Sequence, residues 1–460
     1  MTEPIITYWK PIVHALDPWR PVSPDQVSAL YEPRADAPSR RLARLLRLQS
    51  DPKRFKYVLC GARGAGKTTE LVRLGQELTD AFVPLHIDLE ASLPEESGTL
   101  VIVTLLGLAG LKAIQDWSAG EARREQRTQA IDRGLSGMER ALKQFGVAVD
   151  SLKPWLSYLG PVLSALWGNE VEPGAAALAG EAVGGVASAS LKATQQLKRN
   201  LSREGLRRRV AEDKLDDANA LVEAVNAILL DVEALAGRPP LLLADGLDKR
   251  TEMAEVSQAL MDIDLLQSID APLILSGPIH LRHDPRVRNV PGLFQLQVLN
   301  NIAVARQTEQ GVSEVNLDGV DMLVRLFAKR KVYYRIPSGC FGPEELRRAA
   351  QFSSGLVREF LLLLTYAAEH AIEDEQESVS KDHLDKAIKQ RRLDLENYMN
   401  DHRLSLLKRV MESGTMPGSE DADLLLFNNF IVCYANGDLW FQPNALLMSY
   451  VENFAPNGRT

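Results

Sequence analysis

The sequence has few cysteines, and this scarcity excludes two kinds of architecture. Its 460 residues include three cysteines, Cys60, Cys340 and Cys433, which lie far apart along the chain. They have neither the close spacing of a zinc site nor the density of a disulfide framework. We therefore expect free thiols, a core that is stable without cross-links, and a reducing, cytoplasmic compartment.

Long apolar runs and an excess of positive charge are also missing. No stretch of about 20 uncharged apolar residues occurs, so no ordinary membrane span is expected. The N-terminal residues lack the pattern of a secretory signal. The chain carries 53 Lys and Arg against 61 Asp and Glu, a formal net charge of −8. That balance argues against a surface that coats nucleic acid and leaves open a local basic patch.

The sequence does contain an alternation of short apolar runs and helical patterns. At 45% apolar and 25% charged residues, its composition is that of a globular protein, and its length suggests two or three domains. The predicted strands are residues 57–60, 82–89, 241–245, 273–276 and 294–298. Strands separated by helices predict βαβ units and a parallel sheet. Pro84 places the second strand at a sheet edge, or near its own first residue.

Helical periodicity covers much of the remaining chain. After a start whose apolar patches are broken by prolines, a helix begins around Ser39, with leucines up to Leu48 on one face. Residues of about 100–232 form a long helical insert between the second and third strands. Further helices are predicted at 67–78, 343–352, 355–372, 380–396, 402–413 and 421–428. A hairpin of residues 430–434 and 439–441 follows, because Asn436-Gly437 is a strong turn signal.

One loop has the composition of a phosphate-binding loop. It comprises Gly61, Ala62, Arg63, Gly64, Ala65, Gly66, Lys67 and Thr68, followed by Thr69. Its glycines let backbone N–H groups converge on phosphate oxygens, and the next helix presents its N-terminus to the anion. We expect Lys67 to reach the β- and γ-phosphates and Thr68 to hold Mg²⁺ through its hydroxyl. The sequence therefore predicts a nucleoside triphosphate site, for ATP with Mg²⁺.

A carboxylate at the tip of another strand would complete the magnesium site. Asp245 ends the strand 241–245 at the edge of the sheet where ligands bind, and we expect it to organise the Mg²⁺ water shell. No Glu follows Asp245 directly, so Asp248 is the candidate for orienting the attacking water. In the alternative, Asp248 caps the next helix or pairs with a nearby cation. Hydrolysis is then slow, and the nucleotide acts as a switch.

These two motifs carry a resemblance to a known class. The loop Gly61–Thr68, followed by the run Leu-Leu-Leu-Ala-Asp-Gly-Leu-Asp at 241–248, resembles the ATPase module of the STAND class, whose NACHT-type members carry an Asp-Gly-Leu-Asp element. The later layout resembles origin-recognition-type AAA+ ATPases, which share this core and add a helical lid and a small winged-helix domain. Lys249 departs from the pattern, because the family often has an acidic residue there.

The resemblance implies an α/β P-loop NTPase with a five-stranded parallel sheet, a long helical insert, a helical lid and a C-terminal winged-helix domain. The implied boundaries are an N-terminal segment at 1–35, the ATPase domain at 36–300, the lid at 301–397 and the winged-helix-like domain at 398–460.

It also implies residues that sense the nucleotide. Ser276 ends the fourth strand, where a polar sensor would touch the γ-phosphate; the alternative is a turn serine. Arg358 opens a lid helix and is similar to the second sensor of AAA+ proteins, with an ordinary surface arginine as the alternative. An arginine finger acting on a neighbouring subunit would come from Arg282, Arg286 or Arg288, unless these residues form a solvated loop.

The middle of the insert, residues 145–210, leaves several alternatives open. Apolar residues from Leu152 to Trp167 fall on one helical face, bent at Pro161, and Gly180 and Gly184 have a spacing that permits close helix packing. The segment is a helical hairpin packed on the core or on another subunit, or residues 152–191 contact a membrane or drive oligomerisation. A basic run at 198–209 could contact nucleic acid.

The C-terminal residues 398–460 have the pattern of a winged helix but the wrong charge for DNA, because acidic residues outnumber basic ones. Aromatic side chains such as Phe427 and Trp440 suit packing against protein, so an intramolecular latch or a partner surface is favoured. The preferred hypothesis is a slowly hydrolysing ATP switch that controls assembly into a homo-oligomer or engagement of another protein. The resemblance to STAND proteins implies a role in bacterial-type defence signalling. The alternative is a DNA-associated AAA+ motor or loader, supported by Arg207–Arg209.

Overall fold

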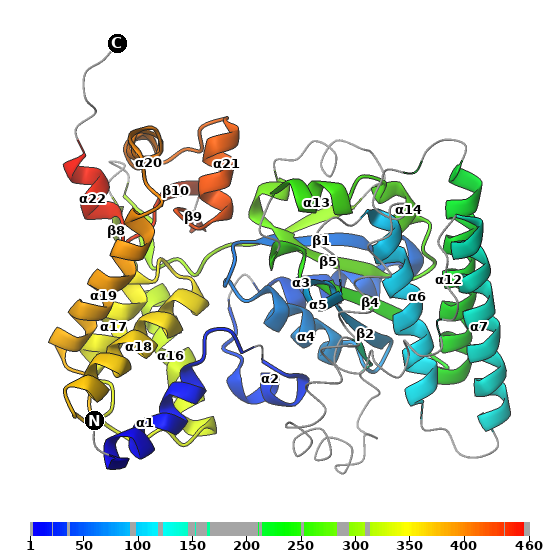
Figure 1. Cartoon of the computed structure of the whole chain (residues 1–460), viewed down its shortest axis with the longest axis horizontal. Helices are drawn as coiled ribbons and strands as arrows, with labels where there is room; N and C mark the ends of the chain where they lie inside the picture. Colours follow the sequence, from blue (N-terminus) through cyan, green and yellow to red (C-terminus); the bar gives the residue numbers. More distant parts are fainter. Residues whose placement is uncertain are drawn as a thin grey trace.

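A mainly parallel sheet lies between layers of helices in the computed structural model (Figure 1). Its order is β3-β2-β4-β5-β1-β6, and β3 alone pairs antiparallel. The five predicted strands and the α/β fold class are confirmed. The strands are β1 (Lys56–Gly61), β2 (Val83–Asp88), β3 (Leu163–Ala165), β4 (Pro240–Asp245), β5 (Leu273–Pro278) and β6 (Gln295–Leu299). The structure describes residues 3–20, 22–34, 37–92, 98–117, 123–145, 152, 163–165, 210, 214–249, 253–282, 294–308, 313–436 and 438–454.

Burial on both faces explains why the central strands β1, β4 and β5 are mainly apolar. In β1, Tyr57 and Leu59 join the core on the side of α3 (Pro38–Leu48) and α4 (Lys67–Glu77). Val58 and Cys60 join the core on the opposite side, which α6 (Thr99–Asp116), α13 (Met253–Ala259) and α14 (Ile263–Gln267) cover. A sheet covered on both faces requires apolar residues at successive positions. Leu48 was expected on the apolar face of α3, but it is 76% exposed because the helix ends there.

The insert contributes a group of three long helices, α6, α7 (Arg124–Gln144) and α12 (Leu215–Ala236). By length and composition α6 could cross a membrane, yet 83% of it is buried inside the protein, as in a core helix. Gly107 lets α7 approach, since a Cβ there would lie 2.7 Å from Met138 Sδ.

Part of the insert differs from the prediction. Residues 163–165, expected on a helical face, form β3 and pair with β2 in the register Leu85↔Ala165. Hydrogen bonding to the open edge of β2 outweighs the helical periodicity of the local sequence. Pro84 fits its expected place, because the β3 pairing begins one residue after it. The Gly180/Gly184 spacing, the basic run 198–209, Arg286 and Arg288 lie outside the described residues.

A second group of helices follows the sheet (Figure 1). The predicted helices and hairpin of this region are confirmed to within a few residues. A small hairpin, β7 (Ala305–Gln307) with β8 (Ser313–Val315), and the final helix α22 (Met448–Asn453) had no clear sequence signal. The other elements are α16 (Leu317–Tyr333), α17 (Pro343–Phe352), α18 (Val357–Glu373), α19 (Lys381–Glu396), α20 (Asp401–Ser413), α21 (Glu420–Phe427), β9 (Ile431–Ala435) and β10 (Leu439–Pro443).

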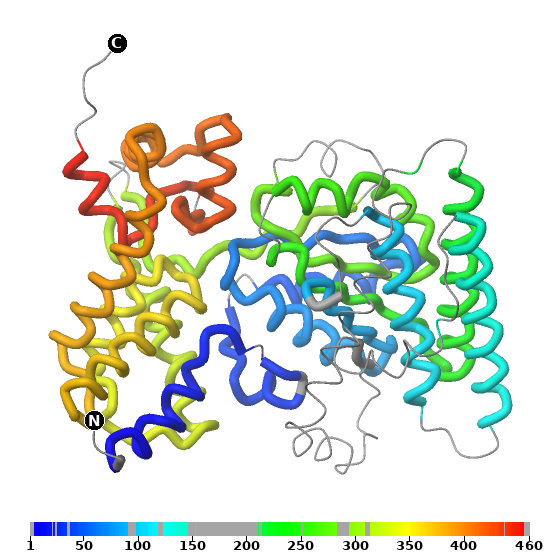
Figure 2. Tube along the Cα trace, in the orientation of Figure 1, coloured from blue at the N-terminus to red at the C-terminus, as the bar shows by residue number. Residues whose placement is uncertain are grey.

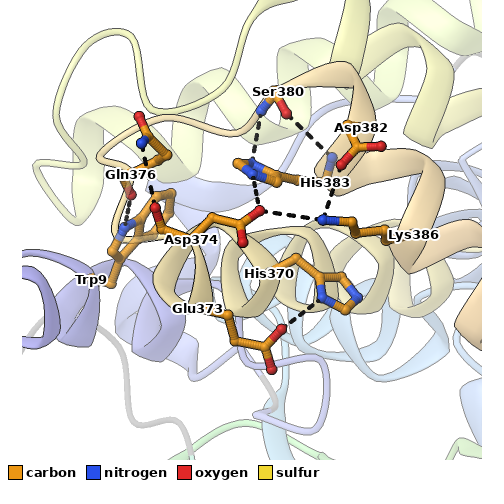
Figure 3. A network of polar contacts seen from close by, with 9 residues as sticks. All are labelled: Trp9, His370, Glu373, Asp374, Gln376, Ser380, Asp382, His383 and Lys386. Carbon is orange, nitrogen blue, oxygen red and sulfur yellow. Dashed lines mark hydrogen bonds and ion pairs between the residues drawn. The ribbon is translucent and has the colours of Figure 1, made fainter. Parts of the chain in front are cut away.

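The N-terminal residues form helices that prolines had concealed, α1 (Glu3–Leu16) and α2 (Pro24–Leu30). Figure 2 shows this blue segment running from the yellow and orange helices to the side of α4. On α1, Trp9 is fully buried and its Nε1 donates to the Gln376 carbonyl at 2.8 Å. The same α18–α19 turn is closed by Asp374, which accepts from His383 and Lys386 (Figure 3). Residues distant in sequence thereby fix α1 to the helical group.

A partly buried histidine on β2 should make stability depend on pH. The Nε2 atom of His86 is buried beside Gly75 of α4 and has no hydrogen-bond partner within the described chain. Burial lowers the pKa of His86 from 6.5 to about 4. Between these values the unfolded chain binds a proton that the folded chain does not, so the free energy of unfolding falls as pH falls, by up to about 3 kcal/mol.

Urea unfolding of His86→Leu at a series of pH values should show a shallower loss between pH 6.5 and 4 than the unsubstituted protein. The same change at His402, which is exposed on α20, should leave the steep loss in place. An unaltered slope in His86→Leu would assign the loss to other groups.

Candidate nucleotide-binding site

The predicted phosphate loop joins β1 to α4, and two of its glycines adopt conformations that favour glycine. Gly64 has φ +80° and Gly66 has φ +101°, in the left-handed region. A Cβ at Gly64 would also lie 2.6 Å from the Cβ of Arg358, so this glycine permits α18 to approach the loop. The backbone N–H of Arg358 donates to the Gly64 carbonyl at 3.2 Å. The loop and the start of α18 are therefore in direct contact.

The Lys67 ammonium is buried and fully engaged. Its Nζ donates to the carbonyls of Gly61 at 2.7 Å and Ala62 at 2.8 Å. It also forms an ion pair with Asp248 Oδ2 at 2.9 Å, and both side chains are less than 10% exposed. A buried ammonium requires such partners, because desolvation of an unpaired charge is costly. The predicted alternative for Asp248, a pairing with a nearby cation, matches this geometry, and the cation is the loop lysine itself.

Thr68 and Asp245 lie together, as a magnesium site requires. Thr68 Oγ1 donates to Asp245 Oδ2 at 2.5 Å. The other oxygen, Oδ1, is buried and accepts no hydrogen bond from the described residues. No cluster of three or more metal-ligating side chains occurs in the described part of the chain. A hydroxyl, one carboxylate and an unused oxygen suit Mg²⁺, which keeps several waters and takes few protein ligands.

Ser276 connects the two acidic residues. The Gly246 N–H donates to Ser276 Oγ at 2.8 Å, and Ser276 Oγ donates to Asp248 Oδ1 at 3.3 Å. Burial and the neighbouring Asp248 carboxylate raise the pKa of Asp245. Burial also acts to raise the pKa of Asp248, but the Lys67 ammonium outweighs it, so that this pKa is lowered. Two carboxylates thus lie close together at the end of β4, where a cation would relieve their repulsion.

Arg63 connects the loop to the C-terminal elements. Its Nε donates to the Asp248 carbonyl at 2.8 Å, and its guanidinium lies 4.2 Å from the ring centroid of Phe427 on α21. Asn429, which follows α21, donates from Nδ2 to the Arg63 carbonyl at 3.0 Å. Phe427 also contacts His280 at the end of β5, with 5.3 Å between ring centroids. Residues distant in sequence therefore lie directly on the phosphate loop.

A cavity of about 330 Å³ extends from the loop to the N-terminal segment and the lid helices. Thr69 lies with the loop at its polar end, while Ile302, Met322 and Leu361 contribute apolar surface. Such a division suits the phosphates and the base of a nucleotide. Several lining residues had no site assigned from sequence, among them Trp19 and Tyr31 of the N-terminal segment, and Asp88 and Glu90 at and after the end of β2. The prolines of the N-terminal segment had concealed its helices, and with them the place of Trp19 and Tyr31. For Asp88 and Glu90, the acidic residues at the end of β2 were the available sequence signal.

The N-terminal wall of the cavity is anchored to α4. Tyr31 Oη donates to Glu70 Oε1 at 3.0 Å, and the Ser39 N–H donates to Glu70 Oε2 at 3.2 Å. Burial, followed by the Glu70 charge, raises the pKa of Tyr31 to about 12, so the phenol stays protonated as a donor. One buried carboxylate on the helix after the phosphate loop therefore positions the segment around α2.

The sensor candidates differ in their placement. Arg358 lines the cavity, with its guanidinium 4.7 Å from the ring centroid of Trp19, and its buried Nε has no hydrogen-bond partner within the described chain. Ser276 lies behind the loop, buried between Asp248 and Gly246. Arg282 ends the short helix after β5 and is not among the residues that line the cavity.

Comparisons with known proteins give structural neighbours only. No family model and no curated protein sequence matches the chain. The ORC2 protein of Aeropyrum pernix, in ADPNP–ADP complexes, is 11% identical over 96% of each chain, with a TM-score of 0.41. The ORC1 protein of Aeropyrum pernix, in complex with DNA, is 13% identical over 92% of this chain and 94% of its own, with a TM-score of 0.35. Drosophila ORC bound to DNA is 11% identical over 94% of this chain and 92% of its own, with a TM-score of 0.32.

The parallel sheet and the loop between β1 and α4 define a P-loop nucleotide-binding fold.

Trp19 should contribute to nucleotide affinity through Arg358. Its ring is 68% exposed, so the contact with the guanidinium is worth roughly 0.5–1 kcal/mol. Trp19→Ala should weaken ATP binding by roughly 2- to 5-fold in calorimetric titration, and Trp19→Phe should retain part of the affinity. Equal affinity in Trp19→Ala and the unsubstituted protein would show that the ring does not hold Arg358 in place.

Proposed function

We propose that the protein is an ATP-binding, slowly hydrolysing regulatory switch of the STAND/AAA+ type, whose nucleotide state controls assembly or engagement of a partner. The observation that carries this proposal is the Lys67–Asp248 pair, together with the contact of Phe427 and Asn429 with Arg63. One end of this chain of contacts lies in the triphosphate position, and the other end lies in the C-terminal elements. A ligand at the first end therefore acts on the second.

Competition for Lys67 is the first step of the proposed switch. A triphosphate attracts the ammonium away from Asp248, which then loses its main positive partner. The Asp248 carbonyl accepts from Arg63, so movement of the short helix Leu247–Lys249 changes the position of the guanidinium. That guanidinium is the surface on which Phe427 rests. Nucleotide binding then alters how firmly the C-terminal elements are held.

The lid responds through a second route. Arg358 lies at the start of α18 and faces the cavity beside the loop, so we assign it the sensing of phosphate. When bound, Mg²⁺ would be held by Thr68 and Asp245 and would neutralise charge on the phosphates. Trp19 and Tyr31 form a wall of the same cavity, so movement of α18 also displaces the N-terminal segment.

The surface of the C-terminal elements supports a protein contact over DNA binding. The helix α21 begins with Glu420, Asp421 and Asp423, and the first two are exposed. Three carboxylates in the first turn would repel phosphates at the end of the helix that ordinarily attracts them. We therefore assign residues 398–460, with their winged-helix-like order of elements, to a latch or a partner surface.

The proposed binding step is tested by Lys67→Ala. Loss of the charged contact should weaken ATP binding by roughly 10- to 100-fold, as measured by calorimetric titration. Lys53→Ala is the matched control, because this lysine is 52% exposed and pairs with the surface residue Asp270 at 3.5 Å. Unchanged affinity in Lys67→Ala would contradict the central assignment.

Turnover and oligomeric state, measured with and without DNA, separate the switch from a DNA-associated motor. ATP-dependent assembly with no effect of DNA is the expected result, whereas strong stimulation of turnover by DNA would contradict the switch.

The latch is tested by Phe427→Leu, which keeps an apolar side chain and removes the aromatic ring under Arg63. Without nucleotide, amide hydrogen exchange of residues 401–451 should be faster than in the unsubstituted protein, approaching the exchange seen with ATP. Phe352→Leu is the matched control, since Phe352 lies under Arg348, 5.2 Å away, outside the nucleotide cavity. Equal exchange in Phe427→Leu and the unsubstituted protein would exclude Phe427 as the latch contact.

A further inference from the structure

The position directly after Asp245 carries no carboxylate, and a residue from the helical turn after the neighbouring strand β2 fills its space. Gly246 has φ +111°, a conformation that other residues rarely adopt. A Cβ placed on Gly246 would lie 2.6 Å from the backbone nitrogen of Glu90 and 3.1 Å from the Glu90 Cβ. Glu90 comes from the first turn after β2, which pairs with β4 in the register Asp88↔Asp245. The Glu90 side chain therefore starts from nearly the same place as a side chain at position 246 would.

The Glu90 carboxylate is both accessible and oriented. It lines the nucleotide cavity together with Lys67 and Thr68. Its side chain is 53% exposed, so a water molecule can reach it, and Lys249 Nζ holds one oxygen, Oε2, at 2.7 Å. Burial acts to lower the pKa of Lys249, but Asp245, Glu90 and Asp88 outweigh it and raise that pKa, so the ammonium stays charged. Lys249 thus orients a carboxylate supplied by the short helix that follows β2.

Two other carboxylates beside the phosphate loop, those of Asp248 and Asp245, are less suited to receive a proton from water. Asp248 is 6% exposed, and its two oxygens are engaged by Lys67 and Ser276. Asp245 Oδ2 accepts from Thr68, and its remaining oxygen is the one that fits a cation. A general base needs a carboxylate that water can approach, which among these three groups describes Glu90.

We propose that Glu90 is the general base of ATP hydrolysis in this protein, and that Lys249 is the residue that positions it. In this step the water oxygen bonds to the γ-phosphorus as the bond from that phosphorus to the bridging oxygen breaks. The proton leaves the water for a Glu90 carboxylate oxygen, and the products are ADP and inorganic phosphate. This proposal rests on the proposed function, because it requires ATP bound at Lys67.

The test is single-turnover hydrolysis of ATP labelled at the γ-phosphate, with ATP affinity measured in parallel on the full chain. Glu90→Gln should keep affinity within about 2-fold and slow hydrolysis by roughly 100-fold or more. Lys249→Met should slow hydrolysis by less than 10-fold, since it removes orientation and not the base. Glu314→Gln, an exposed glutamate paired with Arg306 away from the cavity, is the matched control and should be unaffected.

Several results would overturn the proposal. Full activity in Glu90→Gln with activity lost in Asp248→Asn or Asp88→Asn would assign the base to one of those residues. Equal losses of hydrolysis rate in Lys249→Met and Glu90→Gln would show that the Lys249–Glu90 pair acts as a structural contact and not as a base with its positioning residue. If the unsubstituted protein binds ATP tightly but hydrolyses it no faster than Lys67→Ala, Glu90 is not a general base, while the proposed nucleotide-binding switch still stands. Failure of the unsubstituted protein to bind ATP would instead remove the proposed function.

Discussion

The buried ammonium of Lys67 is the constraint on which the rest of the site depends. A charge with this little exposure must have partners in every state of the protein, and here two loop carbonyls and Asp248 supply them. Asp248 is in turn held by Ser276, and its backbone carbonyl receives Arg63. The positions of β4, β5 and α21 are thus coupled to a single cation. In the proposed switch, a strong anion bound in the loop takes Asp248's place as the partner of Lys67, and the contacts that depend on this pair change with it.

Much of the fold was predictable from the sequence, because the patterns that indicate its strands, turns and helices involve residues close together along the chain. Apolar runs, glycine spacing and turn pairs predict β1 to β6, the loop and the C-terminal helices to within a few residues, apart from β3. Asp245 was predictable as well, since it ends an apolar strand beside Thr68. The N-terminal helices were not, because Pro11 within α1 reads as a break, and Trp9 stabilises that helix through contacts with distant residues such as Gln376 in the α18–α19 turn.

The contacts that make the site specific to this chain join residues distant in sequence, and no local pattern encodes them. Asn429 meets Arg63, and Trp19 meets Arg358, through packing of separate elements. Glu90 follows β2 in the sequence with no motif around it, and its place beside Gly246 depends on the pairing of β2 with β4. Local sequence thus predicts the type of ligand, whereas long-range packing determines which residues surround it.

The N-terminal segment is attached at both ends, to the α18–α19 turn through Trp9 and to α4 through Tyr31 and Ser39. Eight peptide links join Leu16, the last residue of α1, to Pro24, the first of α2. Fully extended, they reach roughly 27 Å. The segment is therefore a tether of fixed length between two groups of elements. It sets an upper limit on how far the helical group can swing from the sheet while both attachments hold.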